Sequence, residues 1–598
     1  MDGQLHPDMT EAEILNIIEA AILNRRRRTI LGKITAVIRK WDDVVYCSFL
    51  FLWFLSLVFT IFIFFVNESW TSCDTKIRWI MLFVNTVPPL LYIGYYYYTV
   101  SSPWEAQVAV GICPHGPRSL VPFLWNHVGL NHREPHRSFL EWEKIFGPVF
   151  TLFLPRPMVV VTGYDQIQQA VRGEEVNARP NSPLYSMFLH GGKDGRGLIL
   201  SSNGVHRQCK GLAKKQLSKF HFTRDEIIDI IQPIGVSMCK MIEDDLDKTA
   251  STPFLDPTRP ISYAVARVIY DIVLGQHPEY DIRDKLWSLK EKLDMVLKEI
   301  QSVRMLFVDG YPITALFLGG PYKRAGMDLQ EFFIDELLET IEACRTHNQA
   351  FPRNIFWTYL EEPMSVNSFL DAVLTAGDVW TGGMETTMTA IRWGLIYLAK
   401  DQERQQKAWK EASKVYKDDA DVIEYSKNEK TPFVMATMYE ILRLANVLPW
   451  NIPHRADPDM HIDVPDGDGG TKKVLVPKGV GVTLSISSVH HNPEHFPDPE
   501  EFRPERYLVE NENGEMKFST ANSKLMPFGG GKRRCLGEPL AVREIYAFLL
   551  QLLTRFRFYI DENRVPSMDR MIGMTSAPYP YVLGIEKRAS WYNHQPKQ

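Results

Sequence analysis

Residues 528–537 read FGGGKRRCLG, and the residues after them, EPLAVREIYAFLLQLLTRF, have the composition of a helix. The stretch holds one cysteine, Cys535, with three consecutive glycines before it and Gly537 after it. Glycines let a tight loop adopt positive φ angles and let another group approach the backbone closely. A helix that starts just after the loop directs its positive end at the thiol, which favours the thiolate. The loop therefore predicts a reactive or metal-binding thiol at Cys535.

A glycine-rich loop can also bind phosphate or a dinucleotide, and neither alternative fits. Gly531-Lys532 resembles the end of a phosphate-binding loop, but Arg533 stands where that loop needs Ser or Thr. A dinucleotide fingerprint has spaced glycines after a buried strand, whereas FSTANSKLMP (518–527) is not a strand core. A catalytic cysteine nucleophile needs a positioned histidine, and the sequence leaves that alternative open. The other interpretation is a haem iron ligand, because an axial thiolate donates electron density and favours O–O cleavage.

The composition excludes several other classes of protein. The 598 residues are 45% hydrophobic, enough for a large core, and a formal charge of −5 without a basic groove argues against nucleic-acid binding. The seven cysteines are scattered, odd in number and free of CxxC pairs, so we expect neither a disulfide scaffold nor a zinc module. Reducing, cytosolic surroundings fit this cysteine usage.

The N-terminal part of the chain has two apolar segments. Residues 44–66 carry no charge and are long enough to cross a bilayer as a helix. Residues 79–100 are also uncharged, although two prolines and a tyrosine run equally fit an interfacial segment. The basic run Arg25–Arg28 places the N-terminus in the cytosol, so two crossings would return the rest of the chain there and leave residues 67–78 in the lumen.

The rest of the chain has the pattern of one mainly α-helical domain with small β-sheets. VFTLFL (149–154) and MVVVTG (158–163) are strand-like, and a long helix is expected from residue 366 to about 399. No linker rich in Pro and Ser divides the domain. The predicted organisation is a basic cytosolic extension (1–43), a transmembrane helix (44–66), a lumenal loop (67–78), a second hydrophobic or transmembrane segment (79–100), a hinge (101–137), the large domain (138–590) and a tail (591–598).

The cysteine loop also matches the signature of a known family. Phe528, Gly531, Arg533, Cys535 and Gly537 fit F-x-x-G-x-R-x-C-x-G, so the chain resembles the cytochrome P450 haem-thiolate monooxygenases over about residues 114–590. The resemblance implies the cytochrome P450 fold, a single large haem domain, behind an N-terminal membrane anchor. It also implies haem b (iron protoporphyrin IX) as cofactor, Cys535 as the axial iron ligand, and Arg533 bound to a haem propionate.

A second motif lies inside the predicted long helix. Two glycines in a helix interior cost about 1 kcal/mol each relative to alanine, so a compensating function is expected. Gly382, Gly383, Glu385 and Thr386 match the family's [A/G]-G-x-[D/E]-T, which opens a groove for dioxygen above the haem. The resemblance implies that Glu385 and Thr386 are catalytic residues that deliver protons during oxygen activation. The alternative for Thr386 is an ordinary hydrogen bond to the preceding helical turn.

A third set of residues carries charge. Glu440 and Arg443 lie three residues apart, which is typical of a solvated surface pair on a helix. By the resemblance they form, with Arg506, a buried structural network behind the haem loop.

The resemblance leaves the haem propionates partly unassigned. His454 fits a family propionate contact, although an ordinary surface histidine is the alternative. Near residues 197–217 the family has a tryptophan and, four residues later, an arginine, whereas this chain has Arg207 and Gly211 at the aligned positions. Arg207 or Lys210 is a candidate replacement.

The resemblance also predicts partners and location. FLDAVLTAGDVWTGGMETTMTAIRWGLIYL (369–398) and LPWNIPHRA (448–456) resemble the animal microsomal clan of drug, fatty-acid and steroid hydroxylases, and within it the nematode branch with its sterol-hormone-synthesising member. This resemblance implies NADPH electrons delivered by NADPH–cytochrome P450 reductase, with cytochrome b5 as a further partner, a basic rim of Lys532 and Arg534 for the reductase, and a haem domain on the cytosolic face of the endoplasmic reticulum membrane. The substrate would be a lipophilic small molecule, such as a sterol, fatty acid or xenobiotic, in a pocket that includes Ala376, Val379, Trp380, Val447, Leu448 and Thr575. Two alternatives are a lipid isomerase of the same fold that needs no reductase and a non-catalytic haem-binding or lipid-binding protein.

Overall fold

The computed structural model describes residues 113–117, 126, 129–154, 156–180, 195–219, 225–248, 253–275, 282–300, 305, 308, 319–346, 369–466, 468–571 and 573–592. The chain divides into two units, and every described residue belongs to the unit formed by Val108–Glu361 and Asn367–Gln598. The predicted membrane segments 44–66 and 79–100, with the loop between them, lie outside the described residues. Among the helices that are described, none is long and apolar enough to span a bilayer.

The described unit is mainly helical, as the sequence predicts. Its helices are α4 (Pro135–Phe146), α5 (Tyr164–Arg172), α7 (Asn203–Lys219), α8 (Ile228–Lys248), α9 (Thr258–Val273), α10 (Arg283–Ile300), α13 (Gly320–Thr346), α15 (Phe369–Lys400), α16 (Gln402–Val415), α17 (Pro432–Ala445), α18 (Ile486–His491), α19 (Glu538–Arg555) and α20 (Ala589–Tyr592). Four 3-10 turns are η3 (Asp225–Ile227), η5 (Tyr425–Lys430), η6 (Pro504–Tyr507) and η7 (Gly531–Arg533).

Small sheets complete the unit. The strands are β1 (Val149–Phe153), β2 (Pro157–Val161), β3 (Phe254–Leu255), β4 (His454–Arg455), β5 (Met460–Pro465), β6 (Thr471–Val476), β7 (Gly481–Leu484), β8 (Leu508–Glu510), β9 (Met516–Phe518), β10 (Phe556–Tyr559) and β11 (Leu583–Lys587). The largest sheet has the order β1-β2-β7-β4, the next β10-β11-β3, and β5-β6 and β8-β9 are two-stranded. The two predicted strands form the antiparallel β1-β2 hairpin, with Val149 opposite Val161.

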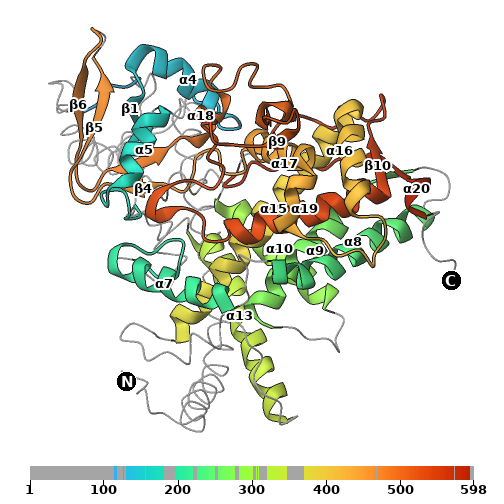
Figure 1. Ribbon diagram of the computed structural model, residues 1–598. Helices are drawn as coiled ribbons and strands as arrows, with labels where there is room; N and C mark the ends of the chain where they lie inside the picture. The colour runs from blue at the N-terminus through green and yellow to red at the C-terminus, as the bar shows by residue number, and fades with distance from the viewer. Residues whose placement is uncertain are drawn as a thin grey trace, which may run out of the picture. The chain divides into compact units, whose positions relative to one another are not determined.

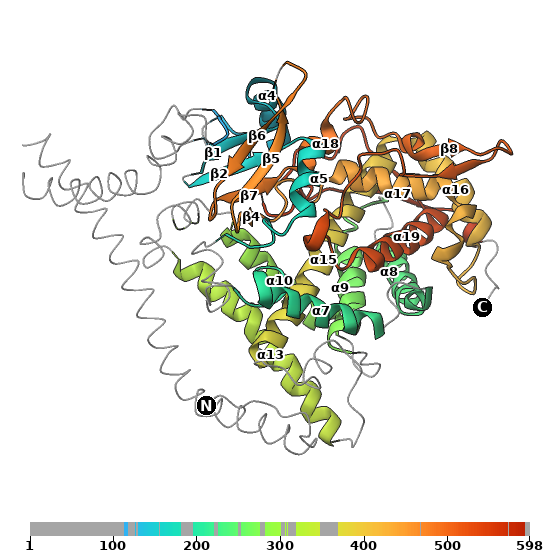
Figure 2. The ribbon, with the colours of Figure 1, turned by 60° about the vertical axis from the view of Figure 1, so that its left-hand side comes forward.

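The predicted long helix is α15, Phe369–Lys400, and residues 366–368 of the prediction lie outside the described residues. It crosses the helical part of the unit, where it packs against α9 and α17 (Figures 1 and 2). Its Trp380 and Trp393 are fully buried, because α15 has neighbours on several faces. The sequence of such a helix is apolar around most of its circumference, unlike that of a surface helix.

Strand β4 and helix α19 position two of the regions where functional residues are predicted. Strand β4 holds His454 at the edge of the largest sheet, opposite Val482 of β7. Helix α19 follows the cysteine loop directly and is almost completely buried from Leu540 onward. The sheet and α19 thereby fix two walls that approach α15 from different sides (Figure 2).

Candidate active site

The cysteine loop is closed by its own backbone. The N–H of Cys535 donates to the carbonyl of Phe528 at 2.9 Å, so the two ends of the motif meet. Gly531 has φ 63°, and a Cβ there would overlap the carbonyl oxygen of Val171 in α5. Only glycine fits that position without moving α5, because it tolerates positive φ and has no side chain. The loop geometry therefore explains Gly531 through close packing against α5.

The thiol of Cys535 faces the cavity beside α15. Cys535 is exposed to that cavity, yet protein surrounds the sulfur closely enough for burial to raise the pKa of the thiol. The backbone N–H groups of Gly537 and Glu538 lower the pKa, as expected at the start of α19. The predicted lowering by the helix start is therefore present, but burial is the larger effect, and the pKa of the free thiol is raised. A cation bound at the sulfur would stabilise the thiolate and lower the pKa of Cys535.

The cavity brings together residues that lie far apart in the sequence. Its walls include the adjacent glycines of the Gly-Gly-x-Glu-Thr motif in α15, the acid and threonine that follow them, the histidine of β4 and the cysteine loop: Gly382, Gly383, Glu385, Thr386, His454, Phe528, Arg533, Cys535 and Gly537. Apolar side chains that also line it include Leu198, Ile199, Ile269, Leu297, Leu484 and Ile486. Of the pocket positions expected from the sequence, Val379, Val447, Leu448 and Thr575 line the cavity. Ala376 and Trp380 do not, and Trp380 packs against Phe333 of α13 instead.

The two adjacent glycines of α15, Gly382 and Gly383, serve different neighbours. A Cβ at Gly383 would come within 2.9 Å of Ile269, so this glycine lets α9 pack closely. A Cβ at Gly382 would meet nothing nearer than Ile199, at 3.9 Å, and Gly382 therefore leaves space at the cavity wall. Gly383 thus allows close helix packing, whereas Gly382 opens the cavity.

Glu385 and Thr386 lie at the same wall with different hydrogen bonds. The Thr386 hydroxyl donates to the Gly382 carbonyl at 2.5 Å, which is the helical bond named as its alternative role. Glu385 is buried, its Oε1 accepts from Thr575 at 3.1 Å, and its Oε2 has no hydrogen-bond partner among the described residues. Burial raises the pKa of the Glu385 carboxyl to about 7, while Lys290 opposes this rise. A carboxyl with that pKa exchanges protons near neutral pH.

The side of the cavity near the cysteine loop is rich in hydrogen-bond donors. Arg533 donates through Nε to the Asn177 carbonyl at 2.9 Å, and it has no ion pair with any described carboxylate. Burial, with the neighbouring Arg179, lowers the pKa of Arg533, which means that its charge lacks a compensating anion. Burial likewise lowers the pKa of His454 well below its usual value, so this histidine is neutral and not a surface residue. This wall fits a planar group with carboxylate side chains.

Helix α7 adds two residues that the sequence analysis did not place together. His206 and Lys210 line the cavity one helical turn apart, whereas Arg207 is exposed and does not. Arg207, which the sequence aligns with the family's tryptophan position, therefore does not face the cavity. The four-residue spacing of the histidine and the lysine indicates that both lie on one face of a helix. Such spacings are common on helices, so this one alone could not identify cavity residues.

The predicted charge network is assembled away from the cavity. Arg443 donates to Glu440 through Nε at 2.9 Å and Nη2 at 2.8 Å, and both side chains are fully buried. Arg506 Nε donates to the same carboxylate at 3.2 Å, and the Tyr507 hydroxyl donates at 3.2 Å. The alternative of a solvated surface pair is excluded by this burial.

The predicted basic rim is exposed but neutralised locally. Lys532 pairs with Glu174, and Arg534 Nε lies 2.6 Å from Glu538. A partner that binds this face must compete with these two glutamates.

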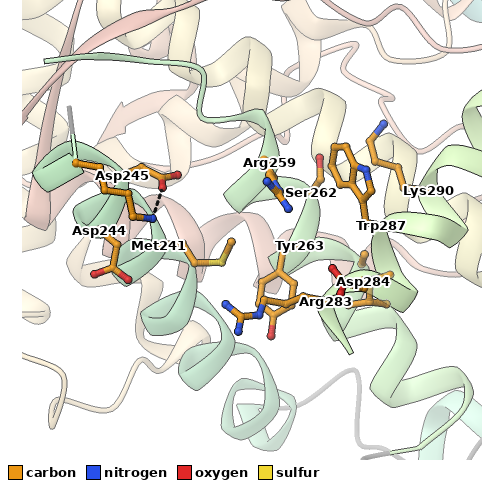
Figure 3. Close-up of a pocket in the computed structure, with 13 residues that line it drawn as sticks. Met241, Asp244, Asp245, Arg259, Ser262, Tyr263, Arg283, Asp284, Trp287 and Lys290 are labelled. Carbon is orange, nitrogen blue, oxygen red and sulfur yellow. Dashed lines mark hydrogen bonds and ion pairs between the residues drawn. The ribbon is translucent and has the colours of Figure 1, made fainter. Parts of the chain in front are cut away.

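A second pocket lies between α8, α9 and α10 (Figure 3). Trp287 is flanked there by Arg259 and Lys290, at 5.4 and 5.8 Å from its ring, and Asp245 pairs with Lys248 at 3.3 Å. Its other walls are largely charged, and neither the cysteine nor the α15 glycines reach it. The cavity beside Cys535 is therefore the candidate active site.

Comparisons with known proteins agree with this choice. The family described as "Cytochrome P450" matches residues 114–585. A curated relative, "3-ketosteroid oxygenase" from Caenorhabditis elegans, is 33% identical over 79% of this chain and 80% of its own length. "Cytochrome P450 2C28" from Mesocricetus auratus is 29% identical over 76% of this chain and 90% of its own length, and "Cytochrome P450 2C55" from Rattus norvegicus is 29% identical over 80% and 95%.

Proposed function

Because the chain belongs to the cytochrome P450 family and is a P450 monooxygenase, we propose that Cys535 binds the iron of a haem b in the cavity beside α15. The supporting observation is that one cavity contains the thiol, the donors of Arg533 and His454, and the Gly-Gly-x-Glu-Thr wall of α15. When bound, haem supplies reductive activation of dioxygen and insertion of one oxygen atom into a substrate C–H bond.

The protein's own groups then have separate tasks. Cys535 holds the iron as thiolate, with the N–H groups of Gly537 and Glu538 directed at the sulfur to stabilise its charge. Arg533 and His454 orient the haem by binding its carboxylates. Gly531 keeps the loop against α5, while Phe528 receives the N–H of Cys535 and fixes the loop's shape.

Proton supply is assigned to the α15 wall. Glu385 holds a proton at Oε2, which has no other partner among the described residues, and its pKa of about 7 lets it release and regain that proton at neutral pH. To take part, the Thr386 hydroxyl breaks its hydrogen bond to the Gly382 carbonyl and then passes the proton into the cavity beside Gly382. Removal of either group would leave oxygen activation without a local proton source.

The substrate is proposed to be a steroid. The C. elegans relative named a 3-ketosteroid oxygenase is 33% identical over four fifths of each chain, and the cavity wall away from the cysteine loop is mainly apolar. Electrons come from NADPH through NADPH–cytochrome P450 reductase, with cytochrome b5 as a second donor. Residues 44–66 and 79–100 anchor the enzyme in the endoplasmic reticulum membrane, with the haem domain in the cytosol.

Reconstitution tests this function. The full chain, in lipid with the reductase and NADPH, is incubated with 3-ketosteroids, fatty acids and drug-like compounds, and both oxygen consumption and hydroxylated product are measured. We expect product only when the reductase is present and preferentially from a 3-ketosteroid. Product without the reductase would indicate an isomerase, and haem binding without oxygen consumption would indicate a binding protein.

A further inference from the structure

Helices α4 and α18 meet through two buried histidines (Figures 1 and 2). The rings of His136 in α4 and His491 in α18 are stacked, with their centroids 3.9 Å apart. One ring nitrogen of each histidine and a carboxylate oxygen of Glu500 lie within 4.8 Å of one another. None of these three residues lines the cavity beside Cys535. The cluster is therefore separate from the candidate active site.

His136 is a buried polar side chain without a hydrogen bond. It is 2% exposed, and neither Nδ1 nor Nε2 has a partner among the described residues. Leaving buried donors and acceptors unpaired is unfavourable, so a bonding group is expected beside this ring. Burial, with the charges of Arg570 and Arg137, lowers the pKa of His136 to about 3. The ring is therefore neutral at pH 7, and one nitrogen has the lone pair that a metal ion needs.

His491 is oriented as a metal-binding histidine usually is. Its Nδ1 lies 3.0 Å from the backbone carbonyl of Ser487. A carbonyl can only accept, so Nδ1 carries the proton and Nε2 carries the lone pair. A hydrogen bond from the second ring nitrogen is the usual support of a histidine that ligates a metal. Burial lowers the pKa of His491 well below its usual value, so this ring is neutral as well.

The buried guanidinium of Arg443 holds the backbone of this cluster. Its Nη1 donates to the carbonyl of His490 at 2.8 Å. It also donates to the carbonyls of Pro499 and Glu501, at 2.7 and 3.2 Å. These three residues precede the second histidine and flank the glutamate of the cluster, so one side chain fixes the backbone that carries both. Ligands on a backbone held in this way need little reorganisation to bind an ion.

Two arginines lie near the cluster, and neither prevents cation binding. Arg570 donates to two backbone carbonyls at the end of α17, so its hydrogen-bonding groups are engaged there. Arg137 Nη2 is 4.0 Å from Glu500 Oε1, and the Arg137 side chain is 53% exposed, so it can turn into solvent when the carboxylate binds a cation. Glu134 lies 2.6 Å from Arg137 and 3.9 Å from Arg570, and it offsets part of their charge.

The donor atoms select the kind of ion. Imidazole suits zinc and similar transition metals, whereas calcium and magnesium prefer oxygen ligands. Two histidines and a glutamate form a known ligand set of Zn²⁺, with water in the fourth position. Tetrahedral ligands about 2.0–2.1 Å from zinc lie about 3.4 Å apart, so an ion would draw the three atoms together by up to about 1.4 Å. The stacked rings must tilt for this, and His136 can do so because no hydrogen bond holds it.

We propose that His136, His491 and Glu500 bind a zinc ion, which links α4 to α18 and to the loop that follows α18. Glu500 is exposed, so water can reach the ion and occupy its fourth position. The ion gives a bonding partner to a nitrogen of His136 and thereby stabilises the contact between the two helices. The site does not include the haem, so its test is independent of the proposed function.

The test measures zinc binding to the full chain, which is purified with a chelator and then dialysed against a series of zinc buffers. Bound zinc is counted by mass spectrometry for the wild type, His136→Phe, Glu500→Gln and the matched control His461→Gln, at an exposed histidine. His136→Phe keeps a ring against His491 and has no hydrogen bond to lose, so it should fold. Thermal unfolding with chelator, followed by circular dichroism, checks the fold of each protein. Zinc bound elsewhere, such as at Cys535, is common to all four proteins and cancels in the comparison.

We expect the wild type and His461→Gln to bind one zinc ion per chain at this site. Losing an outer-shell partner weakens metal binding by about 10- to 100-fold, so losing a ligand in His136→Phe or Glu500→Gln should weaken zinc binding by at least about 10-fold. Zinc should raise the unfolding temperature of the wild type and the control but not of these two variants, and calcium should raise none.

Equal zinc affinity in the wild type, His136→Phe and Glu500→Gln would overturn the proposal. A calcium effect as large as that of zinc would also overturn it, because it would indicate general charge screening. If His136→Phe did not fold, unchanged zinc binding by Glu500→Gln, which alters an exposed side chain, would be sufficient to reject the site.

Discussion

Replacing Glu385 with glutamine should make the protein more stable at alkaline pH while it impairs catalysis. The Glu385 carboxyl is 7% exposed, accepts one hydrogen bond from Thr575, and has no described partner for Oε2. The folded protein therefore destabilises the carboxylate more than water does. Glutamine is neutral and nearly the same size, so Glu385→Gln removes the buried charge and keeps the packing.

The magnitude follows from the pKa shift. Burial raises the pKa of Glu385 from 4.5 to about 7, so between these pH values the folded state binds more protons than the unfolded chain. Stability consequently falls as the pH rises through this window. With about 1.4 kcal/mol per pKa unit, the loss between pH 5 and pH 8 is roughly 2–3 kcal/mol, and Glu385→Gln should not suffer it.

Urea unfolding of wild type and Glu385→Gln at pH 5 and pH 8, followed by circular dichroism, measures this difference. We expect the variant to gain roughly 2–3 kcal/mol on the wild type between the two pH values. Glu562→Gln, at an exposed position, is the matched control and should behave as the wild type at both. If the free energies of unfolding of Glu385→Gln and wild type differed by the same amount at pH 5 and pH 8, the assignment of a buried charge to Glu385 would be refuted.

Three other changes test separate parts of the account. Thr386→Ala should keep haem bound but divert NADPH oxidation to hydrogen peroxide, measured as peroxide per NADPH; unchanged coupling would leave Thr386 with only its bond to Gly382. Arg443→Met should lower the free energy of unfolding by about 3–5 kcal/mol, because it leaves the fully buried Glu440 carboxylate without its main partner, and a loss below about 1 kcal/mol would contradict the network. Protease added to sealed microsomes should digest the haem domain. Asn67-Glu68-Ser69 in the predicted lumenal loop is an N-glycosylation triplet, so an endoglycosidase shift should disappear in Asn67→Gln; a protected haem domain would refute the two-span topology.

Features carried by contiguous motifs could be predicted from the sequence. The Cys535 loop, the glycines of α15 and the β1-β2 hairpin depend on residues close together in the chain, and the structure places them where the patterns indicate. The Glu440 network is less local, and Arg506 was assigned only because the family resemblance supplied it. Its burial could not be derived from a pair spaced three apart, since most such pairs are solvated.

The wrong predictions of cavity-lining residues arose where a shift of one residue places a side chain on a different face of a helix. Successive residues on an α-helix point about 100° apart, so the neighbours His206 and Arg207 of α7 have opposite environments. The same geometry turns Trp380 toward α13 while Val379 lines the cavity. The raised pKa of the Cys535 thiol was missed for another reason: burial depends on the whole fold, whereas the helix start that lowers the pKa is visible in the sequence.

The central claim is that Cys535 is a thiolate ligand of haem iron, and the reduced carbon monoxide difference spectrum tests it most directly. The wild type should show the red-shifted Soret band that a thiolate ligand gives with carbon monoxide. Cys535→Ala should lose that band entirely, while Cys113→Ala, which changes a buried cysteine that does not line the cavity, should retain it. A Cys535→Ala protein that keeps the red-shifted band would contradict the assignment and with it the proposed site.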